Sequence, residues 1–337
     1  MKRHDSLNGS LLGIFSMIAL ALISVPALAQ EFTARIGHLE SPQQSRHIHL
    51  EKVARLVFER TNGAVTFELF PQGQLGNQRQ MTESVQLGTL EATVSPAAFL
   101  GGFNPAISIL DIPYFIPADA VTAQILRESA FGDALLMSFN NRGVVGVAWW
   151  PNGLKNFTSN RPLDDISAFA DQKFRVMDSS ILIEQFNALG ASAIALPFGE
   201  LYTSLQTGVV DGQENPLDTI QRMKFFEVQD YLVISEHGAL EDVILFNPTW
   251  WNNLPENFQS IIKNAFNEVV PELTSHKAAA VAEALKFIGE SDIHIRVATP
   301  DERAAFATKM KEPAIQAYIE RAGDEGRALI DMYNANK

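Results

Sequence analysis

The sequence of 337 residues contains no cysteine. Disulfides, thiolate zinc sites and a cysteine nucleophile are therefore excluded together. Basic residues are also scarce, because 26 lysines and arginines stand against 39 aspartates and glutamates, for a formal net charge of −13. A chain this acidic suits nucleic acid poorly, since neutralisation of phosphates by lysine and arginine supplies most of that affinity. We therefore expect no nucleic-acid partner.

Long apolar runs are absent after the first 30 residues. Met1 to His4 forms a short basic start, Leu11 to Leu22 is apolar, and Ala27-Leu28-Ala29 offers small residues for cleavage. This is the layout of a secretory signal peptide, and the apolar run is shorter than the ~20 residues that a membrane span needs. We predict cleavage after Ala29, export to the periplasm and a soluble mature protein. A retained membrane anchor is the alternative.

The remaining length of about 308 residues exceeds what one hydrophobic core usually organises, so two lobes are expected. Apolar residues alternate at 32–37 and 65–69, and a helical stripe lies between them at 50–58. Two strands joined by such a helix predict a right-handed crossover and a parallel sheet. Further helices are expected near 77–88, 119–140, 179–189, 198–207 and 216–226, and further strands near 143–149, 173–177, 192–196, 230–235, 241–246 and 293–298. This order predicts an α/β fold.

Two segments are candidates for the connections between the lobes. Pro151-Asn152-Gly153 predicts a turn directly after a strand that ends in Trp149-Trp150. Residues 256–289 have a helical pattern, which at 1.5 Å per residue would run on the order of 45 Å. Pro271 should kink or break this helix near Val269-Val270. One long helix across both lobes and two shorter helices therefore remain alternatives.

The segment LQTGVVDGQENP at 205–216 resembles the solute-binding subunits of tripartite ATP-independent periplasmic (TRAP) transporters, of the dicarboxylate-binding, DctP-like type. Other segments agree in order and spacing, namely Gln72–Gly76 with Gly88–Leu90, Asp111–Tyr114, Thr158–Leu163 and Lys173–Met177. The resemblance covers essentially the whole chain after the leader. It implies a two-lobed periplasmic-binding-protein fold (type II-like), with a hinge and a long helix spanning both lobes.

The resemblance also implies a function. Such a protein binds a small organic acid outside the cytoplasm and delivers it, by cleft closure, to the integral membrane subunits of a TRAP transporter. We expect lobe I to contain 30–152 and about 241–280, and lobe II to contain 153–240 and about 281–337. We further expect a monomer with no cofactor, no metal and no enzymatic activity.

Two other functions are alternatives. A binding lobe could instead serve an ATP-driven importer or a sensor. An α/β enzyme acting on a carboxylate is disfavoured, because the sequence has no Gly-x-Ser-x-Gly elbow and no phosphate-binding glycine loop with a lysine. His47 and His49 lie two residues apart on a helix, so their rings diverge and cannot easily share a metal.

Arg175 is the central candidate for ligand binding. In its predicted strand, Phe174 and Val176 point to one face and Arg175 to the other. The resemblance implies that Arg175 grips the ligand carboxylate through both guanidinium nitrogens, which suits its planar fork and permanent charge. A surface arginine paired with Asp171 or Asp178 is the alternative.

The resemblance implies three more ligand contacts in the second lobe. Asn215 would donate a hydrogen bond to the same carboxylate, although Asn followed by Pro216 also suits the start of a helix at 216–226. Phe198 would pack on the bound acid group, or else in the core. Lys155 stands where several relatives carry a second arginine. It would bind the carboxylate by one hydrogen bond, or else face solvent.

Four residues of the first lobe and the crossing complete the predicted site. His38 ends the first strand, where the family often places a polar ligand contact, although a lone histidine is more often structural. Ser95 stands in the loop where sialic-acid-binding relatives have an acidic residue, which argues against sialic acid. Trp150 would form a flat wall of the cleft, although Trp149 and Trp150 must face opposite ways. Glu241 would meet ligand hydroxyls at the return crossing.

Overall fold

The computed structural model describes residues 31–336. The predicted leader and its cleavage site after Ala29 lie outside the described residues. No helix in this described part of the chain is both long enough and apolar enough to cross a membrane.

The described residues form one mixed sheet of nine strands, covered by helices. The strands are β1 (Phe32–Gly37), β2 (Val65–Phe70), β3 (Ala92–Pro96), β4 (Val145–Ser159), β5 (Lys173–Val176), β6 (Ser192–Ala195), β7 (Gly212–Pro216), β8 (Tyr231–Phe246) and β9 (His294–Val297). The α-helices are α1 (Ser45–Arg60), α2 (Gln78–Leu87), α3 (Ala120–Arg127), α4 (Ala130–Met137), α5 (Ser180–Ala188), α6 (Leu201–Gln206), α7 (Leu217–Arg222), α8 (Pro248–Asn253), α9 (Glu256–Glu268), α10 (Val270–Ile288) and α11 (Pro300–Ala335). Short 3-10 helices are η1 (Ala97–Phe99), η2 (Pro105–Asp111), η3 (Asn140–Arg142), η4 (Ile166–Phe169), η5 (Phe198–Glu200) and η6 (Phe225–Val228).

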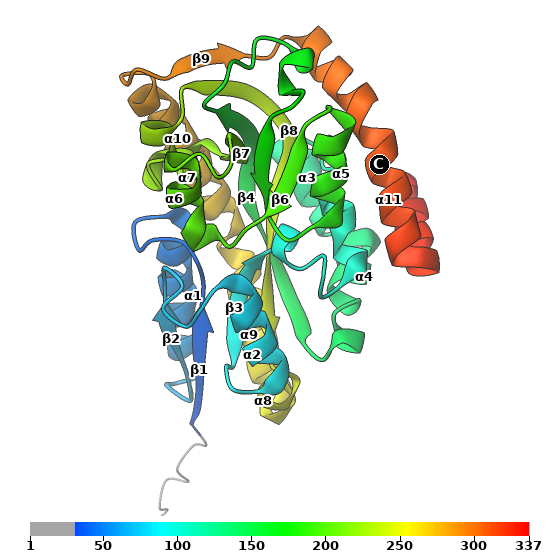
Figure 1. Cartoon of the computed structure of the whole chain (residues 1–337). Coiled ribbons are helices and arrows are strands. Elements are labelled where there is room, and N and C mark those ends of the chain that lie inside the picture. The colour runs from blue at the N-terminus through cyan, green and yellow to red at the C-terminus, as the bar shows by residue number, and fades with distance from the viewer. Residues whose placement is uncertain (1–30, 337) are drawn as a thin grey trace, which may run out of the picture. The chain divides into compact units, whose positions relative to one another are not determined.

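The strand order is β2-β1-β3-β8-β4-β7-β5-β6, with β9 on β8. The predicted parallel pairing of β1 and β2 is confirmed. The two long strands β4 and β8 run antiparallel through the centre of the sheet (Figure 1). β3 pairs with β8 only at 242–246, and β7 pairs with β4 only at 155–159. The shorter strands therefore attach to opposite ends of the central pair, which divides the sheet between two lobes.

The predicted turn at Pro151-Asn152-Gly153 is wrong, because strand β4 continues without interruption through these residues. The register between β4 and β8 shifts between Pro151 and Gly153, and Gly153 has φ +134°, a conformation that favours glycine. A bulge of this kind bends a strand without ending it. The predicted strands 230–235 and 241–246 likewise form one strand, β8. The crossing is thus a bent two-strand ribbon, and the lobe bounds predicted at 152/153 and 240/241 remain a prediction.

The helical pattern at 256–289 forms two helices that meet at Val269. Pro271 explains the break, because its ring clashes with the carbonyl four residues earlier and it lacks an N–H donor. The second helix, α10, contacts both α1 and α7, which lie beside opposite ends of the central strands (Figure 1). α10 therefore bridges the two halves of the sheet.

Other helices differ from the predicted ranges. The helix predicted at 119–140 is divided into α3 and α4, because Ser129 caps a new helix by accepting a hydrogen bond from the Phe131 amide. The helix predicted at 216–226 is the shorter α7 followed by η6. The predictions did not include α11, which begins with a capping box formed by Thr299 and Glu302 and packs against both α4 and α5.

Candidate functional site: a cleft at the crossing strands

A small cavity, which we call the front cavity, lies beside the crossing strands. Leu39, Pro96 and Phe99 line it from the β1–β3 end of the sheet. Phe198 and Asn215, two of the predicted ligand contacts, line it from the β5–β7 end. Its volume of about 20 Å³ has room for about one water molecule. The cleft is therefore nearly shut in this structure.

Arg175 is buried on β5, at 1% exposure. Its Nε and Nη2 both donate to the Leu196 carbonyl, at 3.0 and 2.8 Å, and its guanidinium lies 5.6 Å from the centre of the Phe99 ring. Burial lowers the pKa of Arg175 to about 10. Among the described residues it forms no ion pair, so the predicted alternative of a surface pair with Asp171 or Asp178 is wrong. The site therefore contains a buried cation without a direct ion pair, although the charge of Glu214 offsets part of the effect of burial on its pKa.

The opposite faces predicted for the strand around Arg175 are confirmed. Phe174 and Val176 pack in an aromatic core with Phe157 and Phe186. The Arg175 guanidinium lies instead beside Leu196 and the front cavity's Phe99. The strand's two-residue period thus turns its one charged buried side chain away from this core and toward Phe99, a residue that lines the front cavity, whereas Arg175 itself does not line it.

Asn215 lies in β7 rather than at a helix start. Its Nδ2 donates to the Gln213 Oε1, and Pro216 occupies the residue before α7 without any side-chain cap. The predicted capping role is therefore wrong, because sheet pairing with β4 extends the strand through Pro216. Phe198 lines the front cavity and also meets the Phe225 ring edge to face at 6.0 Å. Both predicted roles of Phe198 are thus compatible with its position.

Lys155 is buried at 1% exposure, so the alternative of a solvent-facing lysine is wrong. Its Nζ lies 2.7 Å from the Glu214 Oε1. The other Glu214 oxygen accepts from the His237 Nε2 at 2.6 Å and from the Gln185 Nε2 at 2.7 Å. Burial raises the pKa of Glu214, but Lys155 and His237 outweigh it and hold that pKa at about 2. Lys155 thus neutralises a buried carboxylate and does not line the front cavity.

Two first-lobe candidates lie near the front cavity without lining it. His38 is fully buried, and its Nε2 lies 3.0 Å from the His47 Nδ1. Burial, with the nearby Arg46, lowers the pKa of His38 to about 3, so its ring is neutral at physiological pH. The Ser95 hydroxyl is buried and donates to the carbonyl of Pro96, which itself lines the cavity.

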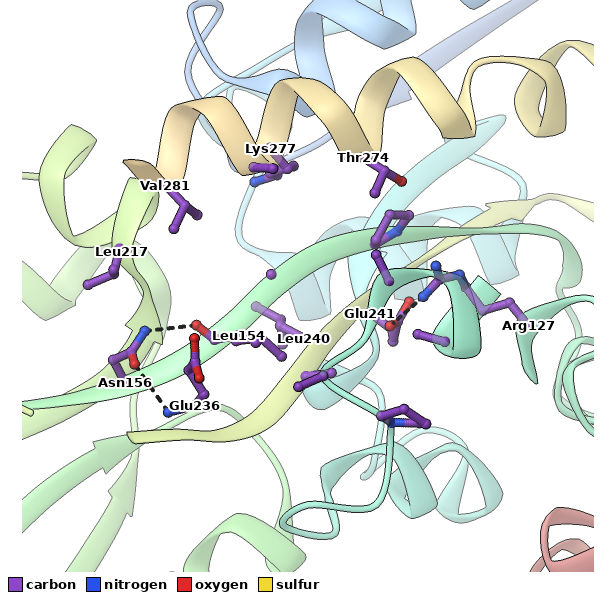
Figure 2. A pocket seen from close by; sticks show the side chains of 18 residues that line it. Arg127, Leu154, Asn156, Leu217, Glu236, Leu240, Glu241, Thr274, Lys277 and Val281 are labelled. Atoms are coloured by element: carbon purple, nitrogen blue, oxygen red, sulfur yellow. Dashed lines mark hydrogen bonds and ion pairs between the residues drawn. The ribbon is translucent and has the colours of Figure 1, made fainter. Parts of the chain in front are cut away.

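The structure does not bring Trp150 or Glu241 to the front cavity. The Trp150 indole is buried in the core and donates to the Phe266 carbonyl at 2.9 Å, while Trp149 packs in a separate core cluster, as predicted from strand alternation. Glu241 lines a second, larger cavity, where it is paired with Arg127 at 2.9 Å (Figure 2).

Sequence reasoning missed a network of five buried charged residues at the crossing. Its members are Glu40, Arg46, Asp218, Asp242 and Lys277. Arg46 binds both oxygens of Asp242, at 2.8 and 2.7 Å, and lies 3.3 Å from Glu40. Lys277 lies 2.8 Å from Asp218 and 3.6 Å from Glu40. Ion pairs thus connect α1, β8, α10 and α7.

Two members of this network also line the front cavity, namely Glu40 and Arg46. Burial raises the pKa of Glu40, but Arg46 and Lys277 outweigh it and hold that pKa at about 2. A sequence signal for the network exists, because Arg46 falls on the same helical stripe as Leu50. A charged residue on an otherwise buried helix face requires a buried partner.

A sheet divided at a bent two-strand ribbon, with a nearly shut cleft beside it, defines a two-lobed ligand-binding protein. The family model described as bacterial extracellular solute-binding protein, family 7 (DctP), matches residues 36–321. The chain belongs to this family, which confirms the resemblance found in its motifs.

Individual relatives and solved structures support the same family assignment. The chain is 31% identical over 331 residues to the C4-dicarboxylate-binding periplasmic protein DctP of Rhodobacter capsulatus, covering 97% of this chain and 98% of that protein. It is 59% identical, with a TM-score of 0.90, to a TRAP periplasmic solute-binding protein from Desulfovibrio salexigens with bound orotic acid, covering 91% of this chain and 98% of that one. A Sulfurospirillum deleyianum protein of the same kind, with bound succinate, gives 29% identity and a TM-score of 0.83, covering 91% and 100%. These relatives are named as binding proteins rather than enzymes, and the two-lobed α/β fold is confirmed.

Proposed function

We propose that this protein binds one small organic carboxylate in the front cavity, with Arg175 as its main contact, and delivers it to the membrane subunits of a TRAP transporter. The observation that carries the proposal is the buried Arg175 guanidinium, which forms no ion pair among the described residues. Glu214, whose charge compensates it in part, is itself bound by Lys155 and His237. A buried charge without a direct ion pair is costly, and a ligand carboxylate would supply that pair.

Arg175 has donors left for such a ligand. The Leu196 carbonyl oxygen accepts hydrogen bonds from Nε and Nη2 of Arg175, whereas Nη1 makes no hydrogen bond among the described residues. The front cavity is too small for an organic acid in its present shape. The ligand must therefore enter an open form, and closure around it would exclude water and strengthen the charged hydrogen bonds. Asn215 and Phe198 are proposed as neighbouring contacts, since both line this cavity.

The far end of the front cavity favours a ligand with a single carboxylate. The charged network there contains three carboxylates against two cations, so it bears one surplus negative charge. Glu40 and Arg46 both line this cavity, but Arg46 is already bound by Asp242 and Glu40. A second ligand carboxylate would therefore meet the surplus negative charge, whereas Glu40 would accept hydrogen bonds from N–H or O–H groups. Orotate, the ligand in the Desulfovibrio salexigens structure, has one carboxylate and ring N–H donors. We therefore propose an orotate-like monocarboxylate rather than a C4-diacid.

Calorimetric titration of the mature protein tests both points. Removing a charged, hydrogen-bonded partner typically costs about 2–5 kcal/mol, so Arg175→Gln should weaken orotate binding by roughly 30- to several-thousand-fold. Arg161→Gln is the matched control, because Arg161 is exposed and donates only to a backbone carbonyl. Near-wild-type affinity in Arg175→Gln would refute the role of Arg175. Succinate binding as tightly as orotate would refute the monocarboxylate specificity.

We also infer export to the periplasm with removal of residues 1–29. The leader layout in the sequence and the periplasmic names of the relatives support this. The intact mass of the protein from a periplasmic extract should correspond to a chain that begins at Gln30. A mass that includes residues 1–29 would contradict the inference.

A further inference from the structure

A second cavity, which we call the rear cavity, lies on the other side of the crossing strands. On β4, Asn152 lines the front cavity while its neighbours Pro151 and Gly153 line the rear one, and on β8 Leu240 lies between the two cavities and lines both. The rear cavity has a volume of about 220 Å³. Figure 2 shows α10 on one side of it, with Thr274 and Val281, and Glu241 with Arg127 at one end.

The walls of the rear cavity are mostly apolar, with alanine, leucine, valine and proline side chains. Its two cations are already neutralised, because Arg127 pairs with Glu241 and Lys277 pairs with Asp218. A hydrophobic cavity of ~150 Å³ is large enough to hold benzene. The rear cavity therefore has room for a small uncharged molecule about the size of a substituted benzene ring.

One polar atom at this cavity has no partner. Glu241 is 4% exposed, and its Oε1 accepts from the Arg127 Nη1 at 2.9 Å. Its Oε2 is buried and makes no hydrogen bond within the described part of the chain. A buried oxygen without a partner is energetically costly and rare in folded proteins. Burial raises the pKa of Glu241 to about 7, so Oε2 can be ionised or protonated near neutral pH. A hydroxyl group on a bound molecule would satisfy it in either form, because a hydroxyl both donates and accepts hydrogen bonds.

The two sides of the rear cavity come from different ends of the sheet. Ala123 and Arg127 belong to α3, which precedes the crossing, whereas Leu217 and Glu236 belong to α7 and to the far half of β8. A rotation about the crossing that widens the front cavity brings these rear walls together. A molecule in the rear cavity would therefore resist opening of the front.

We propose that the rear cavity is an effector site for a small neutral molecule with an apolar body and one hydroxyl group, which hydrogen-bonds to Glu241 and holds the front cavity closed. Its coupling to carboxylate binding rests on the proposed function, but its occupancy does not. Linkage requires the effector and the carboxylate to tighten each other's binding by the same factor. Typical couplings correspond to roughly 5- to 150-fold.

Benzyl alcohol is the probe, and toluene is its matched analogue without the hydroxyl. Ala278 lines the rear cavity from α10, so Ala278→Phe should fill it. Ala278 and Ala279 are both exposed, but Ala279 lines a different surface recess, so Ala279→Phe is the control on the same helix. Calorimetry with the mature protein should show saturable benzyl alcohol binding in wild type and in Ala279→Phe, its loss in Ala278→Phe, and weaker binding of toluene.

Two results would overturn the site itself, whether or not orotate binds. One is the absence of saturable benzyl alcohol binding to the wild-type protein, and the other is equal binding in Ala278→Phe. Toluene binding as tightly as benzyl alcohol would overturn the hydrogen bond to Glu241. If orotate binds, saturating benzyl alcohol should tighten it at least about 5-fold, and an unchanged orotate affinity would overturn the coupling.

Discussion

Replacement of Lys155 by methionine should destabilise the protein strongly, because Glu214 would then be a buried carboxylate without its cation. In the folded protein the pKa of Glu214 lies at about 2 instead of 4.5, although burial alone would raise it. At 1.36 kcal/mol per unit, this difference corresponds to roughly 3 kcal/mol of stabilisation at neutral pH. Breaking one half of a buried ion pair typically costs about 3–5 kcal/mol. We therefore expect Lys155→Met to lose on the order of 3–5 kcal/mol.

Urea unfolding followed by tryptophan fluorescence measures this loss. The double variant Lys155→Met/Glu214→Gln is the matched control, because it removes both charges and should recover most of the stability. The ionisation of Glu214 determines in which direction the stability of the protein changes with pH. Because its folded pKa is lowered, its contribution is complete above about 4.5 and is lost as pH falls through about 2. A loss below about 1 kcal/mol in Lys155→Met at pH 7 would show that Lys155 does not neutralise Glu214.

Two further substitutions test the structure elsewhere. Burial raises the pKa of Asp111 from 3.8 to about 6, so its contribution to stability is lost as pH rises through about 6. Asp111→Asn should therefore stabilise the protein at pH 8 by on the order of 2–3 kcal/mol and change little near pH 4, and urea titrations showing the reverse order would contradict this. Gly212→Ala should lower the melting temperature sharply, because a Cβ there would lie 2.3 Å from the Thr158 carbonyl oxygen and 2.6 Å from the Phe174 ring. Gly199→Ala is its control, since nothing lies within 4 Å, and equal melting temperatures would contradict the expected clash.

The sequence predicted those elements whose pattern is local. β1, α1 and β2 have clear two-residue or helical periods, and the structure confirms them. β3 and β7 were missed for opposite reasons. β3 is buried on both faces and has no alternation, whereas β7 consists of Gly212–Pro216, a segment that favours turns and becomes a strand only between β4 and β5.

The candidate site was only partly predictable for a related reason. The position of Arg175 on its strand follows from alternation, and its proposed role came from the family motif. The ion-pair partner of Lys155 could not be inferred from the local sequence, because Glu214 lies 59 residues away. Arg46 and Asp242 are separated by 196 residues. Pairings of this kind depend on the tertiary fold, which no local pattern contains.

The position of β8 in the sheet has a consequence for how the chain folds. β3 and β4 follow one another in sequence, but β8 lies between them in the sheet. The strands that are synthesised before β8 therefore form two separate groups, β2-β1-β3 and β4-β7-β5-β6, until Tyr231–Phe246 has been synthesised. A nascent chain that ends before residue 246 exposes the edges of both groups. The last central strand therefore joins the two groups, and no N-terminal fragment that ends before Tyr231 contains a connected sheet.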